Sequence, residues 1–201
     1  MFDPAGPVLG IDPGLSRCGY GVVAREPGAI RALGCGVIRT PPGDALPERL
    51  VGLDDELRAL IADVRPSAVA VERVLFQNNA RTAMSVGQAS GLALVVAVRA
   101  GVPVCQYTPN EVKQAVAGYG AAGKEQVQAM VTRLLNLAEV PKPPDAADAL
   151  ALAICHLSAG AFRAAAGLSG RDRSGAASAG PVPGLARAIA AATAAGRKEP
   201  L

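Results

Sequence analysis

The five residues from Ala68 to Glu72, Ala-Val-Ala-Val-Glu, constrain the fold more than any other part of the sequence. Four consecutive apolar residues leave no polar side to face water, which is typical of a strand buried on both faces. Such a strand lies inside a sheet that is covered by helices above and below. The rest of the chain therefore has to supply neighbouring strands and helices for both faces of that sheet.

Three short apolar segments come before this strand, and turn-forming residues separate them. They run from Val8 to Asp12, from Gly19 to Ala24 and from Ile30 to Thr40. Strands joined by Gly-rich turns predict an antiparallel meander. From Leu46 to Val64, leucines recur at helical spacing with charged residues between them, which predicts an amphipathic helix.

The second half of the chain alternates helical and strand patterns. We expect two apolar elements followed by three helices: a helix over Ala80 to Ala100, a strand over Val102 to Tyr107, and helices over Pro109 to Ala117, Lys124 to Leu137 and Asp145 to Leu157. A meander followed by this alternation predicts an α/β fold, with helices on both faces of a mixed sheet.

The composition of the chain changes at residue 159. We expect a folded domain over residues 1–158 and a mostly disordered tail over 159–201, with a weak helix from Leu185 to Ala195, because the tail is rich in Ala, Gly, Ser and Arg. Residues 1–158 contain 14 Lys and Arg against 15 Asp and Glu, whereas the tail contains 6 against 2. The basic excess belongs to the tail and argues against a globally basic surface on the domain.

Cysteine and histidine usage argues against zinc, redox and metal-independent catalytic sites. The four cysteines form no Cys-x-x-Cys pair, and no second histidine or nucleophile motif accompanies His156. No apolar run approaches the roughly 18 residues of a membrane span, and the first residues lack the pattern of a signal peptide. We therefore expect a cytoplasmic protein whose cysteines are core residues: Cys18, Cys35, Cys105 and Cys155.

Two of the predicted buried strands end in a carboxylate. Asp12 closes the first strand, and because Pro13 and Gly14 follow it, a simple turn is the alternative interpretation. Glu72 closes the strand from Ala68, and a salt bridge to an arginine is the alternative there. Ligands of α/β sheets bind at the carboxyl ends of the strands, so both side chains would meet there if their strands are neighbours.

Asp145 and Asp148 open the last predicted helix. Residues three apart share a helix face, so the two carboxylates point the same way. Acids in a first turn also offset the helix dipole, which is the structural alternative. The neighbouring residues are small and apolar, which favours a face that packs inward.

Four carboxylates that converge in one cleft repel each other unless a cation is present. Oxygen ligands without His or Cys select hard ions such as Mg²⁺ or Mn²⁺. Two such ions about 3.5–4 Å apart cleave phosphodiesters by in-line attack of water. The sequence thus supports metal-dependent phosphoryl chemistry, provided that the four acids converge.

Several short motifs lie along the chain from about Val8 to about Leu157. They are Gly10 to Leu15, Val71 to Val74, Gly87 to Ala89, Thr108 to Lys113, Gly123-Lys124 with Gln126-Val127, and Asp145 to Ala151 followed by His156. In order and spacing they resemble the RuvC family of bacterial crossover junction endodeoxyribonucleases. The resemblance implies a ribonuclease-H-like fold with a five-stranded mixed sheet whose first three strands are antiparallel.

The resemblance also implies an activity and partners. Members of the family are homodimers that resolve four-way DNA (Holliday) junctions by symmetric nicks in recombination and repair, together with the RuvA and RuvB branch-migration proteins. Two Mg²⁺ ions, for which Mn²⁺ substitutes, would be held by the matching acids, and two lysines near the scissile phosphate also match. These residues are Asp12, Glu72, Asp145 and Asp148 as metal ligands, and Lys113 and Lys124, which would otherwise be solvated helix lysines.

Two further features concern the partner chain and the junction. The predicted helix from Ala80, with Gln88 and Gly91, resembles the dimer-interface helix of the family; a core helix is the alternative. Where the family has an aromatic residue three positions after the strand glutamate, this chain has Leu75, followed by Phe76. Phe76 is therefore the candidate for stacking on an opened base, unless both are core residues. The basic tail would either add non-specific phosphate affinity or have no role in binding.

Other classes of protein fit parts of the pattern. An actin-like or Hsp70-like ATPase also begins with a strand that ends in Asp, but it needs two such domains, and 201 residues hold one. Another ribonuclease-H-like nuclease, acting on RNA:DNA hybrids, does not account for the junction-type motifs. A non-catalytic junction-binding module leaves the four intact acids unexplained, and metal-dependent nicking separates it from an enzyme.

Overall fold

The computed structural model describes residues 6–74 and 80–165 of the chain. Leu75, Phe76, residues 166–201 and the helix expected from Leu185 to Ala195 lie outside the described residues. The described part contains five strands and five helices, in the order β1 (Val8–Asp12), β2 (Arg17–Glu26), β3 (Ala29–Arg39), α1 (Leu46–Val64), β4 (Ala68–Glu72), α2 (Ala80–Arg99), β5 (Val104–Tyr107), α3 (Pro109–Ala117), α4 (Lys124–Leu134) and α5 (Pro144–Ala165).

The strands form one mixed sheet with the order β3-β2-β1-β4-β5. The first three strands pair antiparallel, and β4 and β5 run parallel to β1. The predicted sheet is therefore confirmed, including its antiparallel meander. The strand from Ala68 to Glu72 lies between β1 and β5, and Ala68, Val69, Ala70 and Val71 are fully buried, as the unbroken apolar run predicted.

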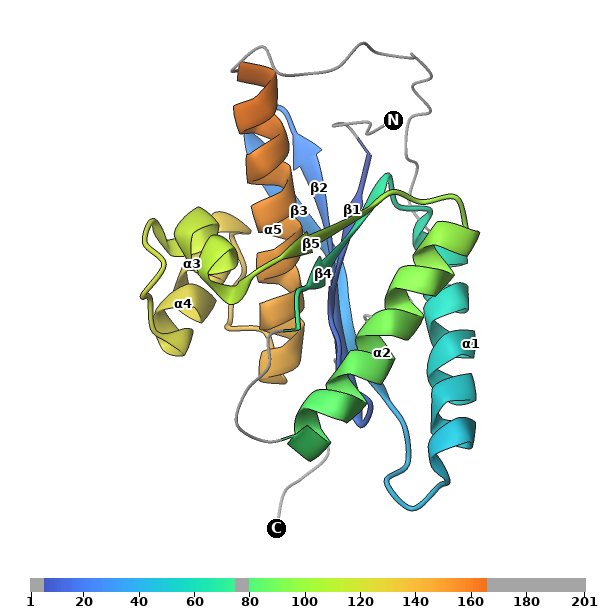
Figure 1. Ribbon diagram of the computed structural model, residues 1–201. Helices are drawn as coiled ribbons and strands as arrows, with labels where there is room; N and C mark the ends of the chain where they lie inside the picture. The colour runs from blue at the N-terminus through green and yellow to red at the C-terminus, as the bar shows by residue number, and fades with distance from the viewer. Residues whose placement is uncertain (1–5, 75–79, 166–201) are drawn as a thin grey trace.

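Helices cover both faces of the sheet, as Figure 1 shows. Side chains alternate along a strand, so Leu9 and Ile11 of β1 pack in the core under α1 and α2. Val8, from the same strand, packs on the other face with α3, α4 and α5. The long helix α5 lies directly against the middle of the sheet on this second face.

The close approach of α5 depends on glycines in the strands beneath it. A Cβ atom on Gly10 would overlap the backbone carbonyl of Ala149, and one on Gly21 would overlap the backbone of Leu150. At the end of the sheet, Gly19 lies in the same way against the backbone of Asp145. The glycines thus set the first turn of α5 directly onto β1 and β2, beside Asp12.

Several element boundaries differ from those that the sequence predicts. The strand β2 extends two residues further at each end than predicted, and β3, α2 and the start of α5 shift by one residue. Larger differences occur at α5, α4 and β5. The helix α5 continues past Leu157 to Ala165, through Gly160 and several alanines. The helix α4 ends at Leu134 and not at Leu137, because Asn136 has a positive φ of 49°. The strand β5 begins at Val104 and not at Val102, since Pro103 has no N–H to donate to the sheet. No helix within residues 6–74 and 80–165 is both long and apolar enough to cross a membrane.

Candidate active site

The register of β1 and β4 places Asp12 and Glu72 side by side. The two strands are parallel, with Gly10 opposite Ala70 and Ile11 opposite Val71. One residue further on, Asp12 and Glu72 stand at the carboxyl ends of both strands and on the face covered by α5. The two predicted carboxylates therefore meet at the sheet edge where α/β proteins bind ligands.

The first turns of α5 bring two further carboxylates to this edge. Asp145 lies over Gly19, which is the β2 partner of Asp12. Asp148 follows one turn later, and both acids remain partly exposed while Ala146, Ala147 and Ala149 between and after them are buried. The small residues hold the helix on the sheet and leave the two acids pointing toward Asp12.

Burial and mutual repulsion make Asp12 hard to ionise. The pKa of Asp12 is raised from 3.8 to about 7, first because the group is buried and then because of the charges of Glu72, Asp148 and Asp145. The pKa of Glu72 is also raised, by burial and by Asp148. The four acids therefore form one interacting cluster, and a bound cation would stabilise its ionised form.

Two basic side chains partly neutralise the cluster. Lys124, the first residue of α4, lies with its Nζ 2.7 Å from Oδ2 of Asp148, and this hydrogen bond raises the pKa of Lys124. Arg17, the first residue of β2, forms an ion pair with Asp145. Sequence reasoning missed Arg17; the signal for it was the short turn after Asp12, which returns β2 alongside the end of β1.

The structure brings Lys124 to the acids but does not do the same for Lys113. Lys113 lies half-buried on α3, and within the described residues no hydrogen bond or ion pair joins it to the cluster. His156 is buried in α5, and its Nδ1 hydrogen-bonds with the hydroxyl of Tyr107 at 2.7 Å, so it belongs to the core. The stacking candidates Leu75 and Phe76 lie outside the described residues.

The donor set fits a hard divalent cation, since every ligand at the cluster is a carboxylate oxygen. As the side chains stand, no three acids, histidines or cysteines within residues 6–74 and 80–165 surround one point closely enough to hold an ion. In this arrangement Asp145 pairs with Arg17 and Asp148 pairs with Lys124. The chemistry of the ligands and the raised pKa of Asp12 nevertheless match a site that works with a bound metal.

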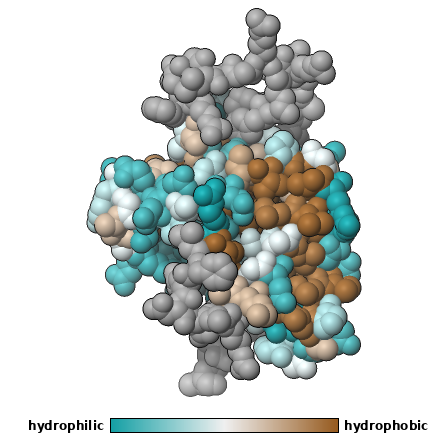
Figure 2. Space-filling model, in the orientation of Figure 1, coloured by the Kyte–Doolittle hydropathy of each residue, from teal (hydrophilic) through white to brown (hydrophobic). Residues whose placement is uncertain are grey.

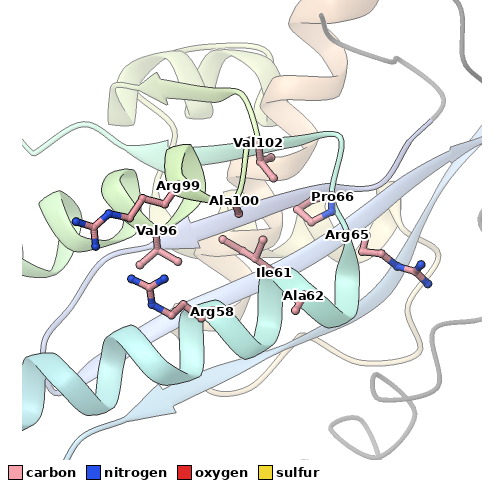
Figure 3. A pocket seen from close by; sticks show the side chains of 10 residues that line it. Arg58, Ile61, Ala62, Arg65, Pro66, Val96, Arg99, Ala100 and Val102 are labelled. Carbon is pink, nitrogen blue, oxygen red and sulfur yellow. The ribbon is translucent and has the colours of Figure 1, made fainter.

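A hollow elsewhere on the molecule is separate from these acids. It has a volume of about 560 Å³ and lies where α1 and α2 end and β5 begins (Figure 3). Its lining includes Arg58, Arg99, Ile61 and Val96, and none of the described residues that line it is acidic. The amino ends of β4 and β5 border it, so it lies at the opposite edge of the sheet from Asp12.

Comparison with known proteins agrees with this geometry. The sequence pattern of the family described as "Crossover junction endodeoxyribonuclease RuvC" matches residues 8–156. A relative of that name from Salinispora arenicola is 59% identical over 157 residues, covering 78% of this chain and 90% of the relative. Another from Leifsonia xyli is 52% identical over 180 residues, covering 89% of this chain and 85% of the relative.

Solved structures give the same answer for the fold. The chain is similar to Thermus thermophilus RuvC in complex with a Holliday junction substrate, with a TM-score of 0.73 and 43% identity, covering 81% of this chain and 96% of that one. The yeast mitochondrial Holliday junction resolvase Ydc2 shares the fold, with a TM-score of 0.60 at 15% identity over 80% of this chain and 83% of that one. The resemblance carried by the short motifs is therefore confirmed, and the chain belongs to the crossover junction endodeoxyribonuclease RuvC family.

Proposed function

We propose that this protein resolves four-way DNA junctions by paired, metal-dependent nicks in strands of like polarity, in DNA recombination and repair. The observation that carries the proposal is the convergence of Asp12, Glu72, Asp145 and Asp148 at the carboxyl ends of β1 and β4. Membership of the RuvC family supports the choice of a junction as the substrate, because a relative with 43% identity was solved with one.

The four acids would hold two Mg²⁺ ions, and Mn²⁺ would substitute for Mg²⁺. When bound, the metal would activate the attacking water and stabilise the leaving oxygen. Asp12 has the central position in the cluster, because the charges of all three other acids raise its pKa. Lys124 would place a positive charge beside the scissile phosphate, where it offsets charge that develops in the transition state. We assign a similar supporting role to Lys113, and junction contacts to Leu75 and Phe76.

A homodimer would supply the two nicks. On α2, Met84, Gln88, Gly91, Val95 and Val98 follow a repeat of four and three residues, which is the spacing of a helix–helix seam. Met84, Val95 and Val98 are 67%, 45% and 65% exposed, and a Cβ on Gly91 would meet nothing within 4 Å. Figure 2 shows hydrophobic side chains gathered on this side of the molecule. We propose that a second copy of α2 packs against this seam.

Other expectations from the family complete the proposal. The RuvA and RuvB branch-migration proteins would deliver the junction to the dimer. The protein would act in the cytoplasm, where its substrate lies and where free thiols persist; Cys18, Cys35, Cys105 and Cys155 are all unpaired in the structure.

Cleavage of a labelled synthetic four-way junction, compared with linear duplex, tests the proposal. With Mg²⁺ we expect paired nicks in the junction alone, and none with EDTA or in the Asp12→Asn variant. Asp55→Asn, a matched change at an exposed acid of α1, should cleave like the wild type. Junction binding without any cleavage would instead identify a non-catalytic binding module, and cleavage of RNA:DNA hybrids in place of junctions would indicate another ribonuclease-H-like nuclease.

A further inference from the structure

Arginines gather on the β2–β3 side of the acidic cluster. Arg17 at the start of β2 and Arg39 at the end of β3 are directly opposite partners in the sheet, so their side chains leave the same face. Like charges in opposite positions destabilise a sheet. Asp145 neutralises Arg17, but within the described residues no acid pairs with Arg39, which is exposed.

A third arginine, Arg49 from the first turns of α1, is held at the same end of the sheet by neutral partners. Its Nε donates to Oγ1 of Thr40 at 3.0 Å, and its Nη2 donates to Oγ of Ser16 at 2.6 Å. The buried Thr40 hydroxyl in turn donates to the backbone carbonyl of Leu15 at 2.6 Å. These bonds fix the guanidinium of Arg49 beside the turn that links Asp12 to Arg17.

The fixed guanidinium keeps its charge and part of its hydrogen-bonding capacity. A guanidinium has five N–H donors, and these contacts use two of them. In the nearby segment 41–48, the Glu48 carboxylate accepts from the backbone N–H of Ala45, and no ion pair joins an acid to Arg49 within the described residues. Ser16 is exposed and accepts from Arg49, which leaves its own hydroxyl hydrogen able to donate outward.

We propose that the hydrogen-bonded pair of Ser16 and Arg49 on the α1 face, and Arg39 on the α5 face of the same end of the sheet, each bind a backbone phosphate of the DNA next to the acidic cluster. Both phosphates would lie across the cluster from Lys124, because Arg17 and Arg39 belong to β2 and β3 while Lys124 pairs with Asp148 and lowers the pKa of Glu72 on β4. A backbone phosphate is the anion that these unneutralised donors suit. The inference rests on the proposed function, since both phosphates are the junction's own.

A purely structural role for Arg49 is the competing explanation, because its hydrogen bonds also brace the turn. The two roles differ in their dependence on salt. A side chain that neutralises a DNA phosphate contributes about 0.9 to the slope of log affinity against log salt, whereas a brace contributes nothing to that slope. The slope therefore measures phosphate contact separately from stability.

The test measures binding of the wild type and its variants to a synthetic four-way junction in EDTA, from low to moderate salt. We expect Arg39→Gln and Arg49→Gln each to lower the slope by about 0.9 and to weaken binding several-fold. The matched control is Arg31→Gln, which removes the same charge at the far end of the β2–β3 hairpin, where Arg31 pairs with Glu26 at 2.7 Å. This control should keep the wild-type slope.

Arg49→Lys keeps the charge and loses the guanidinium fork, so it should keep the slope even if the melting temperature falls. Arg39 takes no part in the hydrogen bonds around the turn, so Arg39→Gln should fold normally. If the wild type binds the junction and the slopes of Arg39→Gln and Arg49→Gln match that of Arg31→Gln, the proposed phosphate contacts are wrong while the proposed function stands. A wild type that does not bind the junction would overturn both.

Discussion

Asp12 is a carboxyl group whose charged form the fold opposes. Its pKa is about 7 in the folded chain, against an ordinary value of 3.8, because of burial and the neighbouring acids. A raised folded pKa means that the group costs no stability below pH 3.8 and destabilises the fold progressively as the pH rises through about 7. The shift of roughly three units sets an upper limit of about 4 kcal/mol on this cost.

Removing the charge of Asp12 should therefore stabilise the fold at high pH. Asp12→Asn, studied in EDTA, should be more stable than the wild type at pH 8 by on the order of 2 kcal/mol, and the difference should vanish toward pH 4. Urea unfolding at both pH values measures it. Asp55→Asn on the exposed face of α1 is the control. A gain that is equal at pH 4 and pH 8 would show that the charge of Asp12 is not its cause.

Lys124, unlike Asp12, should affect the activity of the protein much more than its stability. Its ion pair with Asp148 is exposed, so Lys124→Gln should change the free energy of unfolding by less than about 1 kcal/mol. The rate of junction cleavage should fall by about 10²-fold, the size of effect seen when a charge-stabilising group is removed. Single-turnover cleavage and thermal melting measure the two effects. If the cleavage rate of Lys124→Gln stays within a few-fold of the wild-type rate, Lys124 takes no part in the catalytic chemistry.

At the scale of residues, the sequence predicted the acids better than their partners. Asp12 and Glu72 were recognisable because each ends an apolar strand, and Asp145 and Asp148 because they share a helix face. The ion pair between Arg17 and Asp145 joins residues 128 positions apart. Such a contact depends on how α5 crosses the sheet, which no local pattern contains.

Packing of α5 on the strands is the decisive contact between elements. Gly10 lies under the backbone of Ala149 and Ala153, and neither backbone can move aside without lifting the helix. We predict that Gly10→Ala lowers the free energy of unfolding by about 3 kcal/mol. The rate of junction cleavage should fall as well, because α5 carries Asp145 and Asp148. Gly52→Ala is the matched control, because a Cβ at position 52 meets nothing within 4 Å. Gly52 lies inside the helix α1, so this substitution should raise the free energy of unfolding by about 0.5–1 kcal/mol.

Urea unfolding of both glycine variants measures this prediction. The two substitutions are chemically identical, so opposite signs of the change in unfolding free energy would isolate the close approach of α5 as the cause. A Gly10→Ala variant as stable as the wild type would mean that α5 does not press on β1 as described.

At the scale of elements, periodicity identified every described helix and strand, and only some ends were wrong. The strand β1, the helix α1 and the strand β4 begin and end where the pattern predicts. The helix α4 stops early because Asn136 takes a left-handed conformation, which its residue type permits but does not require. The helix α5 runs on through Gly160, at which the composition of this segment predicts a break, so composition alone could not place its end at Ala165.

At the scale of the whole molecule, the proposed function asks one acidic cluster per chain to produce two nicks. The described residues contain a single such cluster, so paired cleavage would need two chains acting on one junction. The unpartnered seam on α2, from Met84 to Val98, is the surface that we assign to this pairing. Its hydrophobic residues, exposed in one chain, would be buried in the pair.

Breaking the seam should therefore separate binding from paired cleavage. We predict that Val98→Glu, at a position 65% exposed in one chain, yields a monomer in sedimentation, because a buried charge would face its own copy. The fold of the monomer should survive, and its nicks should become single and uncoordinated. Val140→Glu, at an exposed apolar residue outside α2, should remain a dimer. If Val98→Glu sediments as the wild type does and still cuts both strands together, the contact between chains lies elsewhere on the surface.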